Sequence, residues 1–303
     1  MISIVLTFFA KVKQIIEYLQ GEEWNNHLTS AIQEDFGSGI GSGDHSSLAC
    51  FDKNEFGTAK LKAKENGIIA GLSLVPYIFK AIDPTISWKQ FVVDGDEISN
   101  GQILLTATGP VLSLLGAERI MLNYTQRLSG VATLTKKMTK QIEGTHCKLL
   151  DTRKTTPGWR HLEKYAVRLG GGLNHRMGLH DYIMLKDNHI DYCGGIKEAL
   201  VKTSKYLQNK NFLREIEVEV RTIDEVKEAM NEKSINRIML DNFSTKMCFE
   251  AVKIINGIKE TEASGGITED NIKEYALTGV DFISVGALTH SSKNLDLNFK
   301  ADF

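Results

Sequence analysis

The 303-residue sequence contains little cysteine, and its positive and negative charges almost cancel. Its cysteines, Cys50, Cys147, Cys193 and Cys248, are widely spaced and form neither a CxxC motif nor a Cys/His ligand pattern. The formal net charge of −2 argues against the basic face of a nucleic-acid or membrane-surface protein. We therefore interpret the cysteines as reduced thiols of a cytoplasmic protein that binds neither nucleic acid nor membranes.

A long hydrophobic run is also missing. Residues Ile2 to Phe9 are apolar but too few to span a bilayer, and they lack the basic start and cleavage site of a signal peptide. The hydrophobic and charged fractions, 42% and 24%, are those of an ordinary globular protein. The length predicts one large domain or two ordinary ones.

One segment is rich in positive charge although the chain as a whole is not. Residues 151–189 read DTRKTTPGWRHLEKYAVRLGGGLNHRMGLHDYIMLKDNH and hold four of the eight histidines among clustered Arg, Lys and Gly. Arg binds carboxylate or phosphate through two contacts, Lys supplies a mobile charge, and Gly lets the backbone approach an anion. The segment predicts a site for a small ligand with several negative charges. A basic helix face with capping glycines is the alternative.

The first third of the chain has the alternating pattern of a half-exposed antiparallel sheet. Strand-like runs lie at 57–64, 86–93 and 102–107, with a turn at Asp94-Gly95. A helix is expected from Pro110 to about residue 127. We expect Ser129-Gly130 to interrupt it before a second helix over 131–142.

After residue 142, short apolar runs alternate with helical stretches, which is typical of parallel βα units. The expected strands are 147–151, 181–186, 214–220, 237–241, 261–266 and 281–286. Helices are expected between the later strands, at 195–208, 222–232, 244–259 and 268–277. Six units are fewer than the eight of a complete barrel, so the pattern predicts an incomplete or distorted barrel, with polar residues gathered at the carboxyl ends of its strands.

Two pairs of neighbouring residues are typical of a site that binds an anion. Arg153 and Lys154 come directly after a strand, although a solvated basic turn is the alternative. His175 and Arg176 lie in a loop bracketed by glycines. Three consecutive glycines, Gly170-Gly171-Gly172, favour a loop that bends over a ligand, whereas capping of a helix at 159–169 needs only one glycine.

The ends of the next strands bring a lysine and several acids. Lys186 ends an apolar strand, where burial without an anionic partner is costly; His189 is interpreted as structural. In EIEVEV, Glu215, Glu217 and Glu219 share one face. One interpretation is an edge strand whose three glutamates face the solvent. Both faces of a strand in a parallel barrel are covered, however, which favours an inward role for at least one acid.

Asp241 is the natural second acid beside this strand, and a Glu-Asp pair with oxygen ligands suits Mg²⁺ better than zinc. Ser264-Gly265-Gly266 ends the fifth strand and is expected to open a helix. Backbone N–H groups at a helix start bind phosphate, although a Gly-Gly pair alone is a weak signal. The ligand is therefore expected to have a carboxylate-like part and a phosphorylated, hydroxylated part.

These motifs, in this order, closely resemble the quinolinate phosphoribosyltransferases, also called carboxylating nicotinate-nucleotide pyrophosphorylases. The similar segments are GAERIMLNYTQRLSGVAT (116–133), DTRKTTPGWR (151–160), GGGLNHRMGLHDYIMLKDNH (170–189), IEVEV (216–220), IMLDNF (238–243), EASGGI (262–267) and ISVGALTHS (283–291). AKENGIIAG (63–71) and VDGDEISNGQ (93–102) extend the likeness to nearly the whole chain. Residues 37–49, GSGIGSGDHSSLA, depart from the short GD(L/I)T turn of the family.

The resemblance implies an α/β chain of two domains. Residues 1–128 would form an N-terminal α/β sandwich-like domain, and residues 129–289 an incomplete, six- or seven-stranded α/β barrel. The tail, residues 290–303, would return to the first domain. The family forms homodimers in which each site receives an arginine from the neighbouring subunit, and by motif this arginine is Arg119.

The resemblance also implies site residues. Lys154, Lys186, Glu219 and Asp241 would be catalytic, and Glu219 and Asp241 would hold Mg²⁺ directly or through water. The expected substrate-binding residues are Arg119, Thr152, Arg153, Lys154, His175, Arg176, Lys186, Glu219, Asp241, Ser264, Gly265, Gly266, Gly286 and Ala287. The arginines and His175 would meet the carboxylates of quinolinate, and the glycine-rich segments the phosphates.

The implied activity is phosphoribosyl transfer from 5-phosphoribosyl 1-pyrophosphate to quinolinate with loss of CO₂, a step of NAD biosynthesis. Two other classes stay open. A non-catalytic sensor would keep the cationic loop but has no use for Glu219 and Asp241 together. A barrel lyase or aldolase would use Lys186 as a Schiff base. Relatives with other substrates, including a molybdenum-associated homologue, are disfavoured by the intact Arg153, His175 and Arg176.

Overall fold

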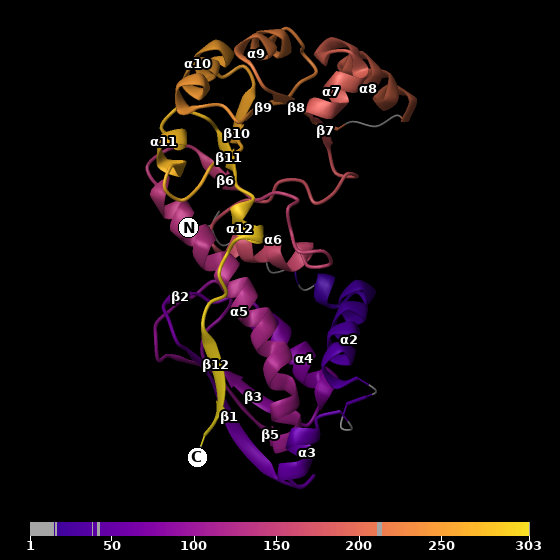
Figure 1. Cartoon of the computed structure of the whole chain (residues 1–303), viewed down its shortest axis with the longest axis vertical. Helices are drawn as coiled ribbons and strands as arrows, with labels where there is room; N and C mark the ends of the chain where they lie inside the picture. Colours follow the sequence, from indigo (N-terminus) through magenta and orange to yellow (C-terminus); the bar gives the residue numbers. More distant parts are fainter. Residues whose placement is uncertain (1–14, 16, 38, 41–42, 211–213, 303) are drawn as a thin grey trace. The chain divides into compact units, whose positions relative to one another are not determined.

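The computed structural model describes residues 15, 17–37, 39–40, 43–210 and 214–302 (Figure 1). The apolar run from Ile2 to Phe9 therefore lies outside the described residues. Within the described chain, no helix combines the length and the apolar character that crossing a membrane requires.

The described residues form two compact units. The first takes its residues from Met1–Lys136, Thr156–Gly171 and Ser291–Phe303, and the second from Lys137–Thr155 and Gly172–His290. The chain thus enters the first unit three times and the second unit twice.

The first unit is built on an antiparallel sheet. Its strands are β1 (Phe56–Ala63), β3 (Ser87–Gln90), β5 (Ile103–Pro110) and β12 (Leu297–Ala301), in the order β12-β1-β5-β3. A separate pair joins β2 (Gly67–Ile68) to β4 (Glu97–Ile98). Leu61 and Ala63 of β1 are buried while Lys60 and Lys62 are partly exposed. The period-two pattern of this segment therefore predicted its strand correctly.

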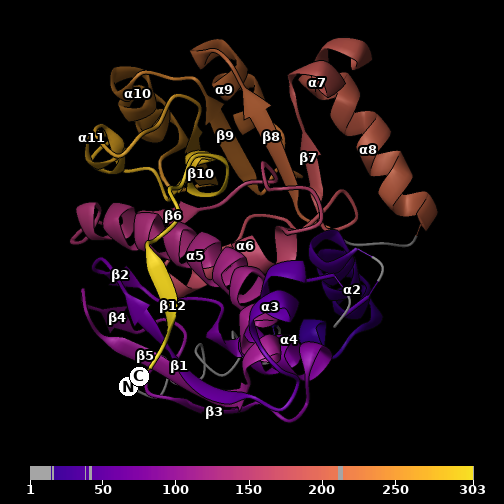
Figure 2. The ribbon, with the colours of Figure 1, turned by 60° about the horizontal axis from the view of Figure 1, so that its bottom comes forward.

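Helices accompany this sheet. They are α2 (Glu22–Phe36), α3 (His45–Cys50), the 3₁₀ turn η1 (Leu72–Leu74), α4 (Val75–Ile82), α5 (Val111–Gln141) and α6 (Arg160–Leu169). Helices α4 and α5 lie along one side of the sheet (Figures 1 and 2). Helix α3 begins after Asp44, whose side chain accepts a hydrogen bond from the Ser47 amide, 3.1 Å away.

The expected interruption at Ser129-Gly130 is wrong, because α5 runs through it without a break. The Ser129 hydroxyl lies inside the unit and accepts a hydrogen bond from the Ala70 amide at 2.9 Å. A Cβ at Gly130 would come within 2.0 Å of the Lys293 carbonyl oxygen. The serine and the glycine are therefore tertiary contacts inside a helix, where a backbone passes close by, and not a helix end.

The units also differ from the expected domains, which divide at residue 128. Residues 156–171 belong to the first unit. Arg127 forms an ion pair of 2.9 Å with Glu163, and Tyr165 donates a hydrogen bond of 3.0 Å to Asp94. Because Glu163 and Asp94 are buried, these polar contacts hold the segment to residues far away in the sequence.

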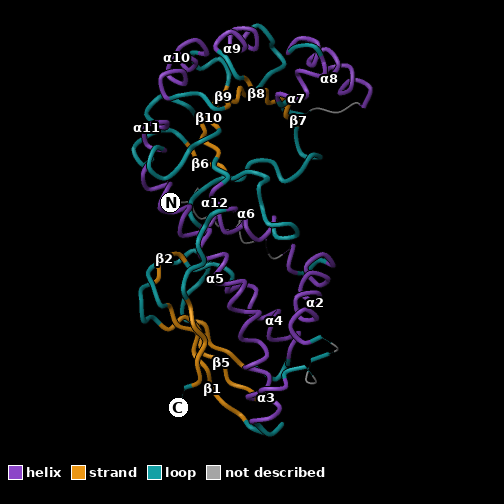
Figure 3. Tube along the Cα trace, viewed as in Figure 1, coloured by secondary structure: helices purple, strands orange, loops and turns teal. Residues whose placement is uncertain are grey.

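The second unit is a six-stranded parallel sheet covered by helices (Figure 3). Its strands are β6 (Lys148–Leu150), β7 (Ile183–Leu185), β8 (Ile216–Val220), β9 (Arg237–Asp241), β10 (Glu260–Ser264) and β11 (Phe282–Ser284), in the order β6-β11-β10-β9-β8-β7. Its helices are α7 (Asp187–Cys193), α8 (Ile196–Lys210), α9 (Ile223–Met230), α10 (Thr245–Ile255), α11 (Ile272–Ala276) and α12 (Ala287–His290). Helices α8, α9 and α10 cover one face of the curved sheet (Figures 1 and 3).

The predicted six βα units and the incomplete barrel are confirmed. Strands β6 and β7 form the two edges of the sheet, and a single bridge joins Leu150 to Leu173 near one edge. Six parallel strands curve without reaching the eight that close a complete barrel. The sheet consequently has one face against the helices and one concave face.

Candidate active site

The register of the parallel sheet gathers polar side chains on one face. Residues paired between neighbouring parallel strands point to the same side, and every second residue along a strand does so too. Glu217 pairs with Arg237, Glu219 and Glu262 both pair with Met239, and Ser264 pairs with Asp241 and Ser284. The face opposite carries Val218, Val220, Ile238, Leu240 and Ala263, all fully buried. One face is therefore packed against apolar groups, and the other carries the chemistry.

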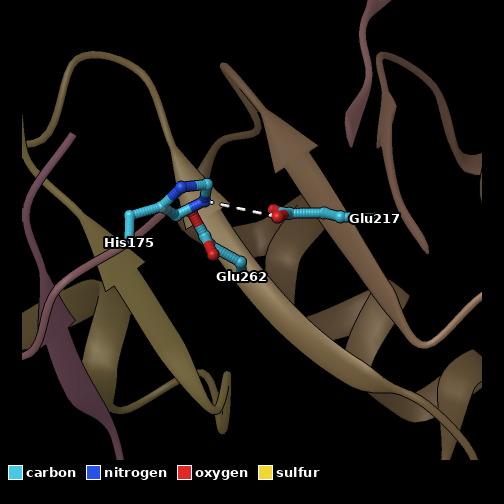
Figure 4. A group of neighbouring side chains, drawn as sticks. All are labelled: His175, Glu217 and Glu262. Atoms are coloured by element: carbon cyan, nitrogen blue, oxygen red, sulfur yellow. Dashed lines mark ion pairs between the residues drawn. The ribbon is translucent and has the colours of Figure 1, made fainter. Parts of the chain in front are cut away.

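A buried histidine and two glutamates lie together on the polar face (Figure 4). His175 Nε2 is 3.3 Å from Glu217 Oε2 and 3.5 Å from Glu262 Oε1. The exposed fractions of the three residues are 8%, 2% and 0%. Tyr182 donates a hydrogen bond of 2.9 Å to the same Glu217 oxygen, and its own oxygen lies 2.9 Å from His175 Nε2. The imidazole is thus held from several sides.

Arg237 balances part of this negative charge. It contacts Glu262 Oε2 at 3.1 Å and Glu260 Oε2 at 2.8 Å, and its guanidinium lies over the Phe282 ring at 4.0 Å. Burial and the charge of Glu217 raise the pKa of Glu262 to about 7. Burial would raise the pKa of Glu217 as well, but the hydrogen bond and charge of His175 lower it below its usual value. The two carboxyl groups consequently differ in their tendency to hold a proton.

The backbone of the cationic loop is fixed by a buried carboxylate. Asp151, directly after β6, accepts hydrogen bonds from the His175 amide at 2.9 Å and from the Asn174 side chain at 2.6 Å. Arg176 donates to the Tyr182 carbonyl at 3.3 Å. Burial, and then the nearby charge of Arg153, lower the pKa of Arg176. A guanidinium whose pKa is lowered by a neighbouring positive charge marks a place where an anion is stabilising.

Lys186 has the anionic partner that its position predicted. Its ammonium lies 3.1 Å from Glu219 Oε2. The amide of Lys186 donates to His189 Nδ1 at 2.9 Å, so His189 supports the start of α7 as expected of a structural residue.

The glycine-rich loop after β10 is shaped by Asn242. A Cβ at Gly265 would lie 2.3 Å from Asn242 Oδ1, and both Gly265 (φ +89°) and Gly266 (φ +63°) have left-handed backbone angles. The Asn242 side chain donates to Asp241 Oδ2 at 2.7 Å. The expectation that the glycines open a helix is wrong, since α11 begins only at Ile272.

Lys154 lies beside the loop of Gly286 and Ala287, the last of the expected phosphate-binding segments. The Thr289 hydroxyl donates to the Lys154 carbonyl at 2.7 Å, and a Cβ at Gly286 would lie 2.9 Å from Lys154 Cδ. Thr152 accepts a hydrogen bond of 3.0 Å from the Lys154 amide. Ala287 begins α12 directly after Gly286. The structure thus brings the first and last motifs of the second unit into contact.

Of the expected site residues, only Arg119 belongs to the first unit, where it is exposed on α5. The others belong to the second unit. Their arrangement places cationic and acidic groups at the carboxyl ends of parallel strands.

Two family models match this chain. The quinolinate phosphoribosyl transferase N-terminal domain matches residues 44–129, and the C-terminal domain of the same family matches residues 131–300. The chain belongs to the quinolinate phosphoribosyltransferase family.

Relatives in this family are similar over most of their length. The chain is 42% identical to quinolinate phosphoribosyltransferase [decarboxylating] 2b, mitochondrial, of Nicotiana tabacum, covering 90% of this chain and 80% of the relative. It is 41% identical to the probable nicotinate-nucleotide pyrophosphorylase [carboxylating] of Bacillus subtilis, with coverages of 90% and 93%. The structure of nicotinate-nucleotide pyrophosphorylase from Ehrlichia chaffeensis matches with a TM-score of 0.86 at 33% identity, covering 92% of this chain and 98% of that one.

Three residues around His175 were not predicted from the sequence as site residues. They are Tyr182, Arg237 and Glu262. The sequence did contain a pattern that indicates Glu262, because Glu260 and Glu262 alternate along their strand as Glu217 and Glu219 do along theirs. The prediction for this strand, however, concerned only the serine and glycines at its end. Arg237 and Tyr182 stand at the start of a strand and in a loop, where the sequence alone shows no periodicity.

Proposed function

We propose that this chain transfers the phosphoribosyl group of 5-phosphoribosyl 1-pyrophosphate to quinolinate and releases pyrophosphate and CO₂, giving nicotinate mononucleotide. The observation that carries the proposal is the strand register, which puts Glu219 and Asp241 on the polar face of the sheet. The loop that contains His175 and Arg176 contacts the same face, because His175 forms an ion pair with Glu217. A ligand with carboxylates at one end and ribose and phosphates at the other fits this division.

The quinolinate end is the cationic group of Arg153, His175 and Arg176. Two carboxylates on a pyridine ring require at least two positive or strongly donating groups. Asp151 holds the loop backbone, so these donors are positioned before a ligand arrives. Lys154 and Lys186 add positive charge at the strand ends.

The phosphoribosyl end is formed by Glu219, Asp241 and the loops at 264–266 and 286–287. Glu219 and Asp241 lie on neighbouring strands, and each offers the carboxylate oxygens that Mg²⁺ prefers, so the residues fit a magnesium ion. Bound there, Mg²⁺ would offset the charge of the departing pyrophosphate. The acids themselves would orient the ribose hydroxyls.

The reaction follows from this placement. The ring nitrogen of quinolinate attacks C1 of the ribose while pyrophosphate leaves from the opposite side. The nitrogen is then cationic and stabilises the carbanion that remains when the adjacent carboxylate is lost as CO₂. This carbanion takes up a proton to give nicotinate mononucleotide. Lys154 and Lys186 stabilise negative charge during these steps, and the arginines keep the nitrogen aimed at C1.

Release of labelled CO₂ from quinolinate, with and without 5-phosphoribosyl 1-pyrophosphate, tests the proposal. We expect release only when both substrates and Mg²⁺ are present. Arg153→Ala should lose most quinolinate affinity in calorimetry and keep its affinity for 5-phosphoribosyl 1-pyrophosphate. CO₂ release that does not need the second substrate would contradict the proposal, and binding without turnover would favour a sensor.

The Schiff-base lyase is disfavoured by the ion pair of Lys186. The Lys186 ammonium contacts the buried carboxylate of Glu219 at 3.1 Å and would have to give up this ion partner to attack a carbonyl carbon. Borohydride treatment with a carbonyl substrate should leave Lys186 unmodified.

The homodimer with Arg119 donated across the interface is part of the proposal. Arg119 is exposed on α5, as an interface residue of a separate subunit must be. Arg119→Ala and Arg153→Ala should each be inactive as pure proteins. When equal amounts are mixed and exchange subunits, about a quarter of the sites regain both arginines, so activity should return to about that level. No recovery in a demonstrably mixed dimer would exclude donation across the interface.

The cytoplasm is the proposed location, on the basis of the reduced cysteines. The tobacco relative carries the word mitochondrial in its name and a rice relative the word chloroplastic. Fractionation of the source cells distinguishes a cytoplasmic protein from an organellar one.

A further inference from the structure

The glutamates beside His175 have more acceptor oxygens than the surroundings provide donors. Glu217 Oε1 and Glu262 Oε1 are buried, and neither is within ordinary hydrogen-bond geometry of a donor among the described residues. The Ser284 hydroxyl, also buried, is near enough to Glu262 to lower its pKa, which leaves two such oxygens for one further donor. The other oxygen of each is satisfied, by Tyr182 in Glu217 and by Arg237 in Glu262. A buried acceptor without a donor is costly, so something is needed between these two oxygens.

A proton on Glu262 satisfies this need. A protonated carboxyl group becomes a donor at one oxygen. Glu262 has an acceptor close by, since a carboxylate oxygen of Glu217 lies within 4.8 Å of one of its own. One added proton thus turns one of two neighbouring acceptors into a donor that can serve the other.

A metal ion is the rival occupant. The ligand atoms of His175, Glu217 and Glu262 all lie within 4.8 Å of one another, which a tetrahedral transition metal would accept. The charges disfavour it, however. Arg237 already contacts Glu262, and Tyr182 already occupies the space between His175 and Glu217. A divalent cation would have to displace the Tyr182 hydroxyl and would be repelled by the Arg237 guanidinium.

We propose that Glu262 is a positioning residue that acts as a neutral acid, and that its proton holds His175 and Glu217 in the arrangement that receives a dicarboxylate. The proposal rests on the proposed function, because the dicarboxylate is quinolinate. When Glu262 loses its proton, a second negative charge appears next to His175. That charge weakens the attraction for an anionic ligand.

The groups that face Glu262 are consistent with this assignment. They are Glu217 on β8, Arg237 on β9, His175 and Tyr182 in the loop before β7, and Cys147 before β6. Burial and the charge of Glu217 raise the pKa of Glu262 to about 7, against the opposing charges of His175 and Arg237 and a hydrogen bond from Ser284 on β11. The carboxyl group therefore changes its charge close to neutral pH.

Glu262→Gln is the decisive variant, because glutamine has the shape of a protonated glutamate and cannot ionise. Quinolinate affinity is measured by calorimetry from pH 6 to 8.5, where quinolinate remains a dianion. In the unmodified protein the affinity should fall by about fivefold to tenfold over this range. In Glu262→Gln most of this fall should disappear. Glu260→Gln, an exposed carboxyl on the same strand that also contacts Arg237, should behave like the unmodified protein.

The same pH dependence in Glu262→Gln and in the unmodified protein overturns the proposal. Glu262→Ala controls for a purely structural role: it should bind quinolinate more weakly at every pH, while the glutamine variant should not. Tight zinc binding that Glu262→Gln loses also overturns the proposal, in favour of a metal site.

A second measurement needs no ligand and separates this proposal from the proposed function. Carbon-13 spectra of glutamate-labelled protein, assigned with Glu262→Gln, report the charge of Glu262 directly. A carboxyl that remains protonated up to about pH 7 supports the neutral acid even if quinolinate is not the substrate. Titration in the ordinary range of an exposed glutamate, around pH 4 to 5, overturns it.

Discussion

Lys186 and Glu219 form an ion pair between two neighbouring strands of the parallel sheet, with Nζ and Oε2 3.1 Å apart. Their environments differ, because the lysine side chain is 47% exposed and the glutamate side chain only 6%. The lysine neutralises the buried acid and keeps its ammonium at the surface of the polar face. One pair thus stabilises the sheet and places a positive charge at the candidate active site.

Lys186→Met should reduce both activity and stability. Activity should fall by about 100-fold, since a positioned charge near the reacting groups is lost. The free energy of unfolding should fall by about 1–3 kcal/mol because Glu219 loses its ion partner, less than for a fully buried pair. Steady-state kinetics and urea denaturation measure the two effects. Lys205→Met, at an exposed lysine of α8, should change neither.

Arg237→Met should destabilise the protein strongly, by about 3–5 kcal/mol, because it leaves the fully buried Glu262 without its cation. The effect should depend on pH. The pKa of Glu262 is raised, so the stability linked to its proton is present at low pH and is lost as the pH rises through about 7. Without Arg237 that pKa rises further, and the destabilisation should be larger at pH 8.5 than at pH 5.5.

Denaturation curves at the two pH values check this prediction. Glu260→Gln is the matched control, because Glu260 contacts the same guanidinium from a side chain that is 53% exposed. It should cost less than about 1 kcal/mol. Equal losses for Arg237→Met at both pH values would mean that the charge of Glu262 does not change in this range.

Gly265→Ala should cost more stability than Gly266→Ala. Both residues have positive φ angles, so both substitutions strain the backbone. Only at Gly265 would the new Cβ meet Asn242, 2.3 Å from its side-chain oxygen, whereas Gly266 faces open space. We expect an additional loss of about 1–3 kcal/mol for Gly265→Ala, measured by thermal or urea unfolding. Equal losses would show that Asn242 moves aside freely.

Tyr165→Phe should destabilise the first unit by about 1–3 kcal/mol, since the buried Asp94 loses a hydrogen-bond donor. Burial raises the pKa of Asp94 against the hydrogen bonds that lower it. The stability that the Asp94 proton contributes is therefore present at low pH and lost as the pH rises. In Tyr165→Phe this loss is larger, because the ionised Asp94 has one hydrogen-bond donor fewer. The destabilisation should be greater at pH 7 than at pH 4. Tyr206→Phe, at an exposed tyrosine, is the control and should show no pH-dependent loss.

Local patterns in the sequence were sufficient for the barrel and for part of the site. Alternating apolar strands and helices predicted the six parallel strands, because strand and helix periods are properties of consecutive residues. The position of Lys186 at a strand end predicted an anionic partner, and Glu219 is that partner. The motifs that resemble quinolinate phosphoribosyltransferases also lie in consecutive residues, and the family comparisons confirm them.

Features that depend on distant residues were missed or predicted wrongly. Ser129-Gly130 has the composition of a helix break, yet Lys293 and Ala70 make it an internal contact of α5. Residues 156–171 join the first unit through partners such as Arg127 and Asp94, which no local pattern reveals.

By itself, the sequence determined the family, the order of strands and helices, and the residue types available for an anionic substrate. Only the tertiary structure decided which of them meet. Strand register, and not sequence spacing, brings Glu262 and Arg237 behind His175, and burial then changes the pKa values of the acids there. The reason is physical: periodicity is encoded along the chain, whereas the electrostatics of a buried group depends on neighbours that the fold supplies.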